Sequence, residues 1–245
     1  MIKLENITVT FEVKAQSANL VPRRRGLFFR RSYDIREIKA IDGLSLAISN
    51  GERVGIIGAN GAGKTTLLKV IAGIYAPKSG EARVEGRVCP LFEFVTGFEM
   101  EAAGWENIKT RALLLGMDYR TIKERIKEIG EFTELGEFLD VPVRHYSSGM
   151  LLRLAFATST SLDPDVLLLD EVMAAGDIAF VEKAKKRMNE FMNKANIVVF
   201  VSHSLDILPT ICPRIVWLDR GKIAMDGEAR EVIEAYRSKM LSQPA

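Results

Sequence analysis

The stretch Gly58-Ala-Asn-Gly-Ala-Gly-Lys-Thr65 fits the pattern G-x-x-x-x-G-K-[ST], in which a glycine-rich loop cradles phosphate groups. The largely apolar run Arg53–Ile57 before it is typical of a short buried strand, and residues 66–72 after it are typical of a helix. This order of strand, loop and helix allows backbone N–H groups and a helix N-terminus to face an anion. The stretch therefore predicts a binding site for the phosphates of a nucleotide.

Each residue type in this loop has its own part in phosphate binding. Glycines let the backbone approach the phosphates, the Lys64 ammonium can reach the β- and γ-phosphates, and the Thr65 hydroxyl can ligate Mg²⁺. The expected ATP-binding residues of the loop are Gly58, Ala59, Asn60, Gly61, Ala62, Gly63, Lys64, Thr65 and Thr66. A glycine-rich turn without a ligand is the alternative, and it leaves the Lys-Thr pair unexplained.

The composition is that of an ordinary globular protein. The chain has 245 residues, 47% of them hydrophobic and 27% charged, enough for one large α/β domain or two small ones. Its net charge of +2 gives no reason to expect a nucleic-acid partner. Cys89 and Cys212 lie outside any metal-ligand pattern. Because no apolar run could span a bilayer and no signal-peptide pattern is present, we expect a cytoplasmic protein unless a partner holds it at a membrane.

Strands and helices are expected to alternate along the chain, which predicts an α/β fold with a mostly parallel sheet. The expected strands are residues 2–12, 40–48, 81–91 with a break at Gly86, 166–169, 197–201, and the hairpin-like pair 215–218 and 222–225. The expected helices are residues 66–75, 121–138, 151–162, 180–194 and 228–240. The helix-rich block at about 98–160 interrupts the alternation, so we interpret it as a helical subdomain inserted into one domain, residues 1–245.

Two carboxylates, Asp170 and Glu171, follow the apolar strand Val166–Leu169. We expect this strand to lie beside the P-loop strand, so that Asp170 can hold the Mg²⁺ shell through water. Glu171 can then activate a water for in-line attack on the γ-phosphate. A solvated strand end is the alternative, but a P-loop already requires an acidic residue at the metal.

His203 and a serine–glycine turn extend this set of residues. His203 comes just after the expected strand Ile197–Val201 and could contact the γ-phosphate; taken alone, it would be a structural histidine. We therefore expect Lys64, Glu171 and His203 to be the catalytic residues. The turn Ser147-Ser148-Gly149 precedes the expected helix 151–162, where it can bind an anion or simply cap the helix, a cap being worth about 1 kcal/mol.

Together, the P-loop, the serine–glycine turn, the strand ending in Asp170-Glu171 and the downstream His203 resemble the nucleotide-binding subunit of an ABC transporter. The resemblance covers nearly the whole chain and implies a P-loop NTPase core with an antiparallel β subdomain and the helical insert. It implies a homodimer that binds two ATP molecules head to tail, the P-loop of one subunit facing Ser147, Ser148 and Gly149 of the other. ATP binding then closes the dimer, hydrolysis reopens it, and two separate transmembrane permease subunits follow the motion.

The chain departs from the family pattern at several places. Its signature is Tyr-Ser-Ser-Gly-Met at 146–150 instead of Leu-Ser-Gly-Gly-Gln, and its coupling loop is Ala-Ala-Gly-Asp at 174–177 instead of Ser-Ala-Leu-Asp. Glu93 stands where the family has a metal-sensing glutamine, so the expected Mg²⁺ residues are Thr65, Asp170 and Glu93. The family also has an aromatic residue that stacks on adenine, a role that we assign to Tyr33.

Three segments narrow the resemblance to ATPases that export polysaccharides. They are Tyr-Ser-Ser-Gly-Met at 146–150, Leu-Phe-Glu-Phe-Val-Thr-Gly-Phe at 91–98 and Gly-Trp-Glu-Asn-Ile at 104–108. The resemblance implies a peripheral subunit on the cytoplasmic face of the membrane that exports lipid-linked polysaccharide, first of all O-antigen, with capsule glycan or teichoic acid as alternatives. An importer would usually keep Leu-Ser-Gly-Gly-Gln, and a soluble ABC ATPase usually has two P-loops or a coiled coil. Since the chain ends at Ala245 without the carbohydrate-binding β-sandwich of some members, we expect a transporter that does not read a chain-terminating cap.

Two further surfaces are expected to meet partners. Residues 13–39 break the strand pattern and hold eight Lys or Arg against two acidic residues, with aromatic residues interleaved. Such a segment can bind anionic lipid head groups or a lipid pyrophosphate; the alternatives are a solvated loop or packing on the permease. The permease is expected in a groove between the Glu93 loop and residues 98–115. Phe94, Phe98 and Trp105 either line this groove or belong to the core.

Overall fold

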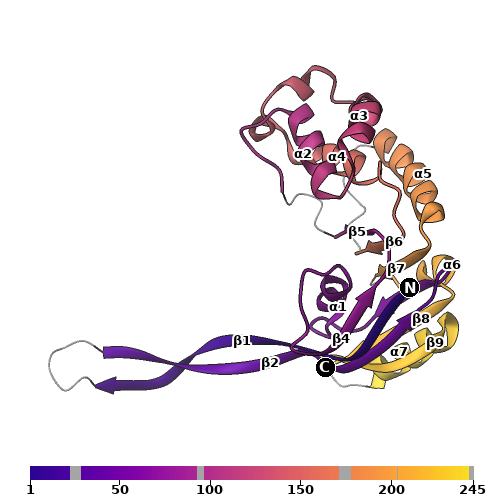
Figure 1. The fold of residues 1–245 in the computed structure, drawn as a ribbon. Helices are drawn as coiled ribbons and strands as arrows, with labels where there is room; N and C mark the ends of the chain where they lie inside the picture. The colour runs from indigo at the N-terminus through magenta and orange to yellow at the C-terminus, as the bar shows by residue number, and fades with distance from the viewer. Residues whose placement is uncertain (23–28, 93–96, 171–177, 203, 243–245) are drawn as a thin grey trace.

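The computed structural model describes residues 1–22, 29–92, 97–170, 178–202 and 204–242. They form two β-sheets with helices around them (Figure 1). The α/β class predicted from the sequence is confirmed, because the larger sheet is mostly parallel and the smaller sheet is antiparallel. No helix within these residues is both long and apolar enough to cross a membrane.

The larger sheet positions the nucleotide site. Its strands, in spatial order, are β5 (Val88–Leu91), β6 (Val166–Leu169), β7 (Ile197–Val201), β3 (Arg53–Ile57), β8 (Arg214–Asp219) and β9 (Lys222–Glu228). The first five are parallel and β9 pairs antiparallel to β8. The expectation that β6 lies beside the P-loop strand β3 is wrong, because β7 pairs with both and separates them.

Both faces of this sheet are buried, which is why its central strands are almost wholly apolar. Val166 and Leu168 face one core, which they share with α1 (Lys64–Ile71) and the smaller sheet. Leu167 and Leu169 face the other core, which they share with α5 (Ile178–Lys194). At the β8 side, α6 (Leu208–Ile211) and α7 (Ala229–Ser242) cover the sheet.

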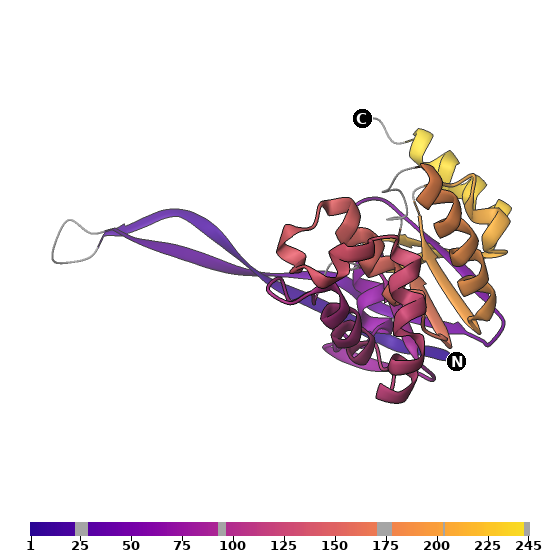
Figure 2. The same cartoon turned by 90° about the horizontal axis from the view of Figure 1, so that it is seen from above.

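The smaller sheet carries a feature that the sequence did not predict. It consists of β2 (Phe29–Ile48), β1 (Ile2–Pro22) and β4 (Ser79–Val84) in that order. Within the described residues of this segment, 13–22 and 29–39, the strands are not broken as expected. Instead, β1 and β2 stay paired from Val13↔Arg36 out to Pro22↔Phe29 and form a long hairpin that projects from the body (Figures 1 and 2). We call residues 13–22 and 29–36 the arm.

The residues between β5 and β6 are mainly helical. They contain α2 (Gly104–Leu114), α3 (Tyr119–Thr133), 3-10 turns at Gly136–Asp140 and Val143–His145, and α4 (Ser148–Ser159). The helix expected over 121–138 stops at Thr133 because Glu134 takes a left-handed conformation, with φ 58°. We call this block the helical subdomain.

Candidate nucleotide-binding site

The P-loop joins the end of β3 to the start of α1 in a backbone conformation that favours glycine. Gly58, Gly61 and Gly63 have φ values of 151°, 78° and 104°. A Cβ atom at Gly58 would lie 2.3 Å from the Leu218 carbonyl oxygen, and one at Gly63 would lie 2.5 Å from that of Ala40. Two of the three glycines are therefore required by contacts with the protein's own backbone as well as by their φ angles.

Lys64 is held within the loop it belongs to. Its side chain is only 7% exposed, and Nζ donates hydrogen bonds to the carbonyl oxygens of Gly58 (2.7 Å) and Ala59 (3.0 Å). The ammonium group is thus positioned at the mouth of the loop by backbone acceptors. It can exchange these acceptors for phosphate oxygens without a large movement.

One cavity of about 350 Å³ brings the main predicted residues together. It is lined by Ala40, Asn60, Gly61, Gly63, Lys64, Thr65, Thr66, Asp170 and Val201. Asp170 reaches this cavity although β7 separates its strand from the P-loop strand, because the carboxyl ends of parallel strands share one edge of the sheet.

The cavity offers oxygen ligands suited to a divalent cation. The Thr65 hydroxyl and the Asp170 carboxylate both line it. Nowhere in the described parts of the chain do three or more His, Cys, Asp or Glu residues gather as a metal site. A few protein oxygens next to a phosphate-binding loop suit Mg²⁺, which keeps most of its other ligands as water and phosphate.

Three predicted residues, Glu93, Glu171 and His203, lie outside the described residues. The backbone on either side shows which elements lead to them. Glu171 follows Asp170 at the end of β6, and Glu93 comes two residues after the end of β5, the neighbour of β6. Their roles stay predictions.

A bulge in the smaller sheet lies beside the cavity. The pairing of β1 with β2 shifts between Val9↔Ile41 and Thr10↔Lys39, which leaves Ala40 as an extra residue at a bulge beside the cavity. The next pair is Phe11↔Ile38, and both side chains are partly exposed, 37% and 53%.

Tyr33, to which the sequence assigned stacking on adenine, pairs with Gln16 on the arm. It lies seven residues from Ala40, about 23 Å along an extended strand. Its role at the base stays a prediction. The sequence did place Phe11 in a strand; what it could not show was the bulge that brings this strand pair to the cavity.

The serine–glycine turn, residues 147–149, lies apart from the P-loop cavity; we call it the signature loop. Ser147 caps α4 by accepting a hydrogen bond from the Met150 N–H at Oγ (3.2 Å). Ser147 and Ser148 are exposed. Beside the loop is a second cavity of about 510 Å³, lined by Glu134, Leu135, Phe138, Ser147, Gly149, Met150 and Arg153. Within one chain the two halves of the expected ATP site therefore do not meet.

Tyr146 ties the signature loop to the helical subdomain. Its hydroxyl donates a hydrogen bond to the Phe138 carbonyl oxygen (2.6 Å). Burial, with the nearby Asp140 carboxylate, raises the pKa of Tyr146 to about 12, so the hydroxyl stays protonated as a donor at neutral pH. The Tyr in place of the family's Leu thus has a structural role next to the loop.

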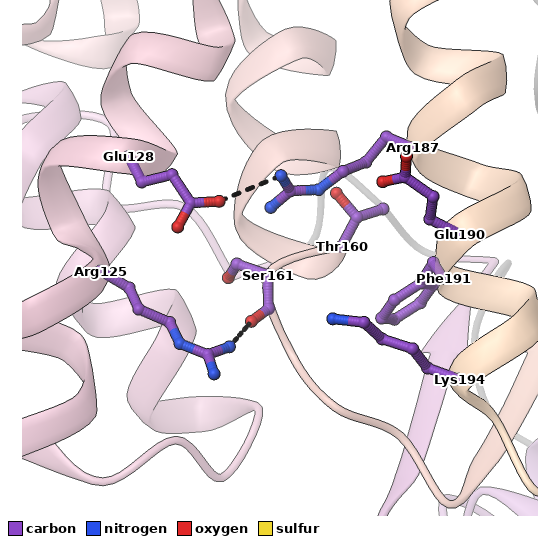
Figure 3. Close-up of a pocket in the computed structure, with 8 residues that line it drawn as sticks. All are labelled: Arg125, Glu128, Thr160, Ser161, Arg187, Glu190, Phe191 and Lys194. Carbon is purple, nitrogen blue, oxygen red and sulfur yellow. Dashed lines mark hydrogen bonds and ion pairs between the residues drawn. The ribbon is translucent and has the colours of Figure 1, made fainter.

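A third cavity, of about 250 Å³, lies between α3 and α5 (Figure 3). Its basic side chains are engaged by neighbours. Arg187 pairs with Glu128 at 3.2 Å, Arg125 donates to the Ser161 carbonyl oxygen at 2.8 Å, and Lys194 pairs with Asp163 at 3.3 Å. We interpret it as an ion-paired seam that joins the helical subdomain to α5, away from the P-loop.

Comparisons with known proteins agree with this geometry. A family model described as ABC transporter matches residues 41–174. An O-antigen export system ATP-binding protein of Myxococcus xanthus is 44% identical over 85% of this chain and 48% of its own length, so the chain spans about half of that relative. A teichoic acids export ATP-binding protein of Listeria innocua is 36% identical over 95% of this chain and 70% of its own length.

Among solved structures, the dimeric ATP-binding cassette MJ0796 bound to ADP and Pi has the same fold. It is 22% identical, with a TM-score of 0.68 over 94% of this chain and 99% of that one. The family match covers more than half of the chain, and the relatives exceed 30% identity over most of it. The chain therefore belongs to the ABC transporter family.

Proposed function

We propose that the chain is the ATP-hydrolysing subunit of an ABC exporter that moves a lipid-linked polysaccharide across the cytoplasmic membrane. The observation that carries the ATPase assignment is the cavity in which Asp170 meets Lys64 and Thr65. The names of the relatives, an O-antigen and a teichoic acids export protein, support the exporter assignment. O-antigen is the first choice because that relative has the higher identity, and teichoic acid or capsule glycan is the alternative.

The residues of the P-loop cavity bind and polarise the phosphates. Lys64 moves its hydrogen bonds from its backbone acceptors to the β- and γ-phosphate oxygens, where its charge stabilises the transition state. Thr65 and Asp170 hold Mg²⁺, and Glu93 is a further ligand. Mg²⁺, when bound, neutralises charge that develops on the phosphate oxygens.

The remaining catalytic roles fall to residues at the ends of β6 and β7. Glu171, next to Asp170, activates the attacking water, and His203 contacts the γ-phosphate. Phe11 stacks on the adenine in place of Tyr33, since it lies one strand pair beyond the cavity-lining bulge.

A second copy of the chain completes each site. Exposed Ser147 and Ser148 at the start of α4 are suited to bind the nucleotide held by the P-loop of the other subunit. The separation of the two cavities within one chain supports this head-to-tail arrangement.

The permease would dock near the end of α2 and hold the subunit at the cytoplasmic face of the membrane. Leu113 and Leu114 are 50% and 71% exposed there, and a Cβ at Gly97 would lie 3.7 Å from Leu114 Cδ1. Of the residues first considered, Phe98 and Trp105 pack in the cores instead. An exposed apolar edge of this kind suits a short helix of a partner.

The test uses cells whose only copy of the protein carries Glu171→Gln. We expect loss of surface polysaccharide and accumulation of lipid-linked polymer inside the cell. Glu182→Gln on the exposed face of α5 is the matched control and should leave export unchanged. Normal surface glycan in the Glu171→Gln cells would overturn the polysaccharide assignment, and undiminished ATP turnover by the purified variant would overturn the role of Glu171.

A further inference from the structure

We propose that the arm of one subunit docks on the helical subdomain of the second subunit, at the concave surface beside its signature loop. This inference rests on the head-to-tail dimer of the proposed function and adds a contact to it. The occupant of the surface is thus a second copy of this chain.

The arm needs a partner for physical reasons. A two-stranded hairpin is marginally stable in water unless a third strand or another surface covers it. β4 pairs with β1 only from Ile2 to Thr8, whereas β1 and β2 remain paired to Pro22↔Phe29. Both views show the arm standing away from the rest of its own chain (Figures 1 and 2).

The arm leaves the body at the nucleotide cavity. It begins two pairs after Phe11↔Ile38, which itself lies close to the bulge at Ala40. In a head-to-tail dimer, the partner's signature loop lies across the nucleotide from this point. The ten residues from Phe11 to Leu20 extend about 30 Å, enough to run over the partner's helical subdomain.

The surface beside the signature loop has the shape and chemistry to receive the arm. The cavity of about 510 Å³ presents Phe138, which is 53% exposed, together with Leu135. Arg153 and Glu134 also line it and pair with each other at 3.6 Å. Close to the lining residues in the chain, Glu131, Glu137 and Asp140 are exposed and form no ion pair within the part of the chain that the structure describes. This segment therefore combines exposed apolar side chains with three unpaired acidic ones.

The sequence of the arm is complementary to this surface. Its paired strands hold Lys14, Arg30, Arg31 and Arg36 against one acidic residue, Asp34, with apolar residues between them. Basic and apolar groups on the arm can meet acidic and apolar groups on the partner. A membrane surface would also attract a basic segment, but it would not explain why the arm starts at the nucleotide cavity.

A disulfide between two differently tagged chains tests the contact directly. One chain carries Arg31→Cys and the other Glu137→Cys, both with Glu171→Gln so that ATP is not consumed. The native Cys89 and Cys212 are buried and do not compete. We expect a cross-link between the two chains that requires Mg²⁺-ATP and mild oxidant. Glu231→Cys, on the exposed start of α7, replaces Glu137→Cys as the control and should give none.

Charge reversal tests the complementarity. Arg30→Glu with Arg31→Glu should weaken the ATP-dependent dimer by about fivefold or more, and Glu131→Lys with Glu137→Lys in the same chain should restore it. Glu231→Lys with Glu234→Lys is the matched control and should not restore it. Thermal melting of each variant verifies that its body is folded.

Two results would overturn the inference. One is an unchanged dimer in the Arg30→Glu, Arg31→Glu variant, with binding to phosphatidylglycerol vesicles lost instead. The other is the absence of a cross-link between the Arg31→Cys chain and the Glu137→Cys chain when both Mg²⁺-ATP and oxidant are present. If the Glu171→Gln protein fails to dimerise with Mg²⁺-ATP at all, the head-to-tail dimer of the proposed function falls, and the arm contact falls with it.

Discussion

The P-loop and the signature loop each begin a helix, yet their surroundings differ. At the P-loop, Cβ atoms on Gly58 and Gly63 would collide with backbone carbonyls of other strands, and Lys64 is almost fully buried. At the signature loop, a Cβ on Gly149 would have Ser147 Oγ, at 3.9 Å, as its nearest neighbour, and Ser148 is exposed.

This difference separates two uses of glycine. Gly58 and Gly63 of the P-loop are needed by the fold before any nucleotide binds. Among the described residues nothing crowds a Cβ at Gly149, so we expect a larger residue there to be felt only by what docks on the loop. The contrast predicts that substitutions at the two loops lose activity for different reasons.

The largest effect is expected from Gly58→Ala or Gly63→Ala. Each adds a Cβ at 2.3–2.5 Å from a carbonyl oxygen, at a φ that L-residues rarely adopt. Strain of both kinds should lower the free energy of unfolding by about 3 kcal/mol. Denaturant unfolding of the purified variants, without nucleotide, measures it.

Gly61→Ala is the matched control for these two variants. Its φ is also positive, 78°, but a Cβ there meets nothing within 4 Å. Only the left-handed conformation is penalised, by about 1 kcal/mol. If all three variants lose the same stability, the collisions with Leu218 and Ala40 are not what makes the P-loop rigid.

The next effect is expected from Gly149→Ala at the signature loop. Stability and ATP affinity of the separate subunit should stay unchanged, because the added Cβ occupies open space. The ATP-dependent dimer and ATP turnover should fall by about 30-fold, since the Cβ would displace the phosphates held by the partner. If Gly149→Ala instead lowers the stability of the subunit but leaves the ATP-dependent dimer intact, Gly149 serves the fold, as the P-loop glycines do, and the proposed difference between the loops is wrong.

The parts of the fold that could be predicted from the sequence are those that adjacent residues specify. The P-loop, the apolar run Val166–Leu169 and the strand Ile197–Val201 are each specified by adjacent residues, and the structure has them at the expected positions. The spatial order of the strands is not local. Nothing in the spacing between Ile57 and Val166 indicates that β7 pairs between their strands. Likewise, the basic composition of residues 13–39 gave no strand pattern, because the strands of the arm are defined only by pairing with each other.

The site shows the same limit. Lys64, Thr65 and Asp170 could be predicted because a motif or a strand end fixes each of them, and one cavity contains all three. The aromatic residue for the base has no such motif, and its assignment to Tyr33 stays a prediction. The bulge at Ala40, which lines the cavity, shows that the Phe11↔Ile38 pair lies nearer to this point along the strands than Tyr33 on the arm.

A smaller effect separates these two aromatic residues. Phe11→Ala should weaken ATP binding by about tenfold, the contribution of one aromatic ring stacked on a base. Tyr33→Ala should leave the affinity unchanged, because its backbone lies far along the arm. Titration with a fluorescent ATP analogue measures the affinity of both variants. Inorganic triphosphate serves as the ligand without a base. Equal affinity of Phe11→Ala and the unaltered protein for ATP would remove Phe11 from the site.

The smallest expected effect is a difference in thiol reactivity between the buried native cysteines and a cysteine placed in the signature loop. Burial raises the pKa of Cys89 and of Cys212 to about 12, so both thiols stay protonated in the folded protein at pH 8 and react slowly with a thiol reagent. Ser148→Cys would place an exposed thiol at the start of α4, which should react quickly.

Mg²⁺-ATP should then slow the labelling of Ser148→Cys in the Glu171→Gln background, because the partner's nucleotide covers the signature loop in the closed dimer. Labelling that ignores ATP would mean that this loop stays open to solvent, and fast labelling of the native cysteines would contradict the packing of the sheet. Because the folded thiol pKa values exceed those of the unfolded chain, ionisation of Cys89 and Cys212 should also reduce stability as the pH rises from about 9 toward 12. The buried P-loop and cysteines are thus expected to respond to pH and denaturant, and the exposed signature loop to ATP and a second subunit.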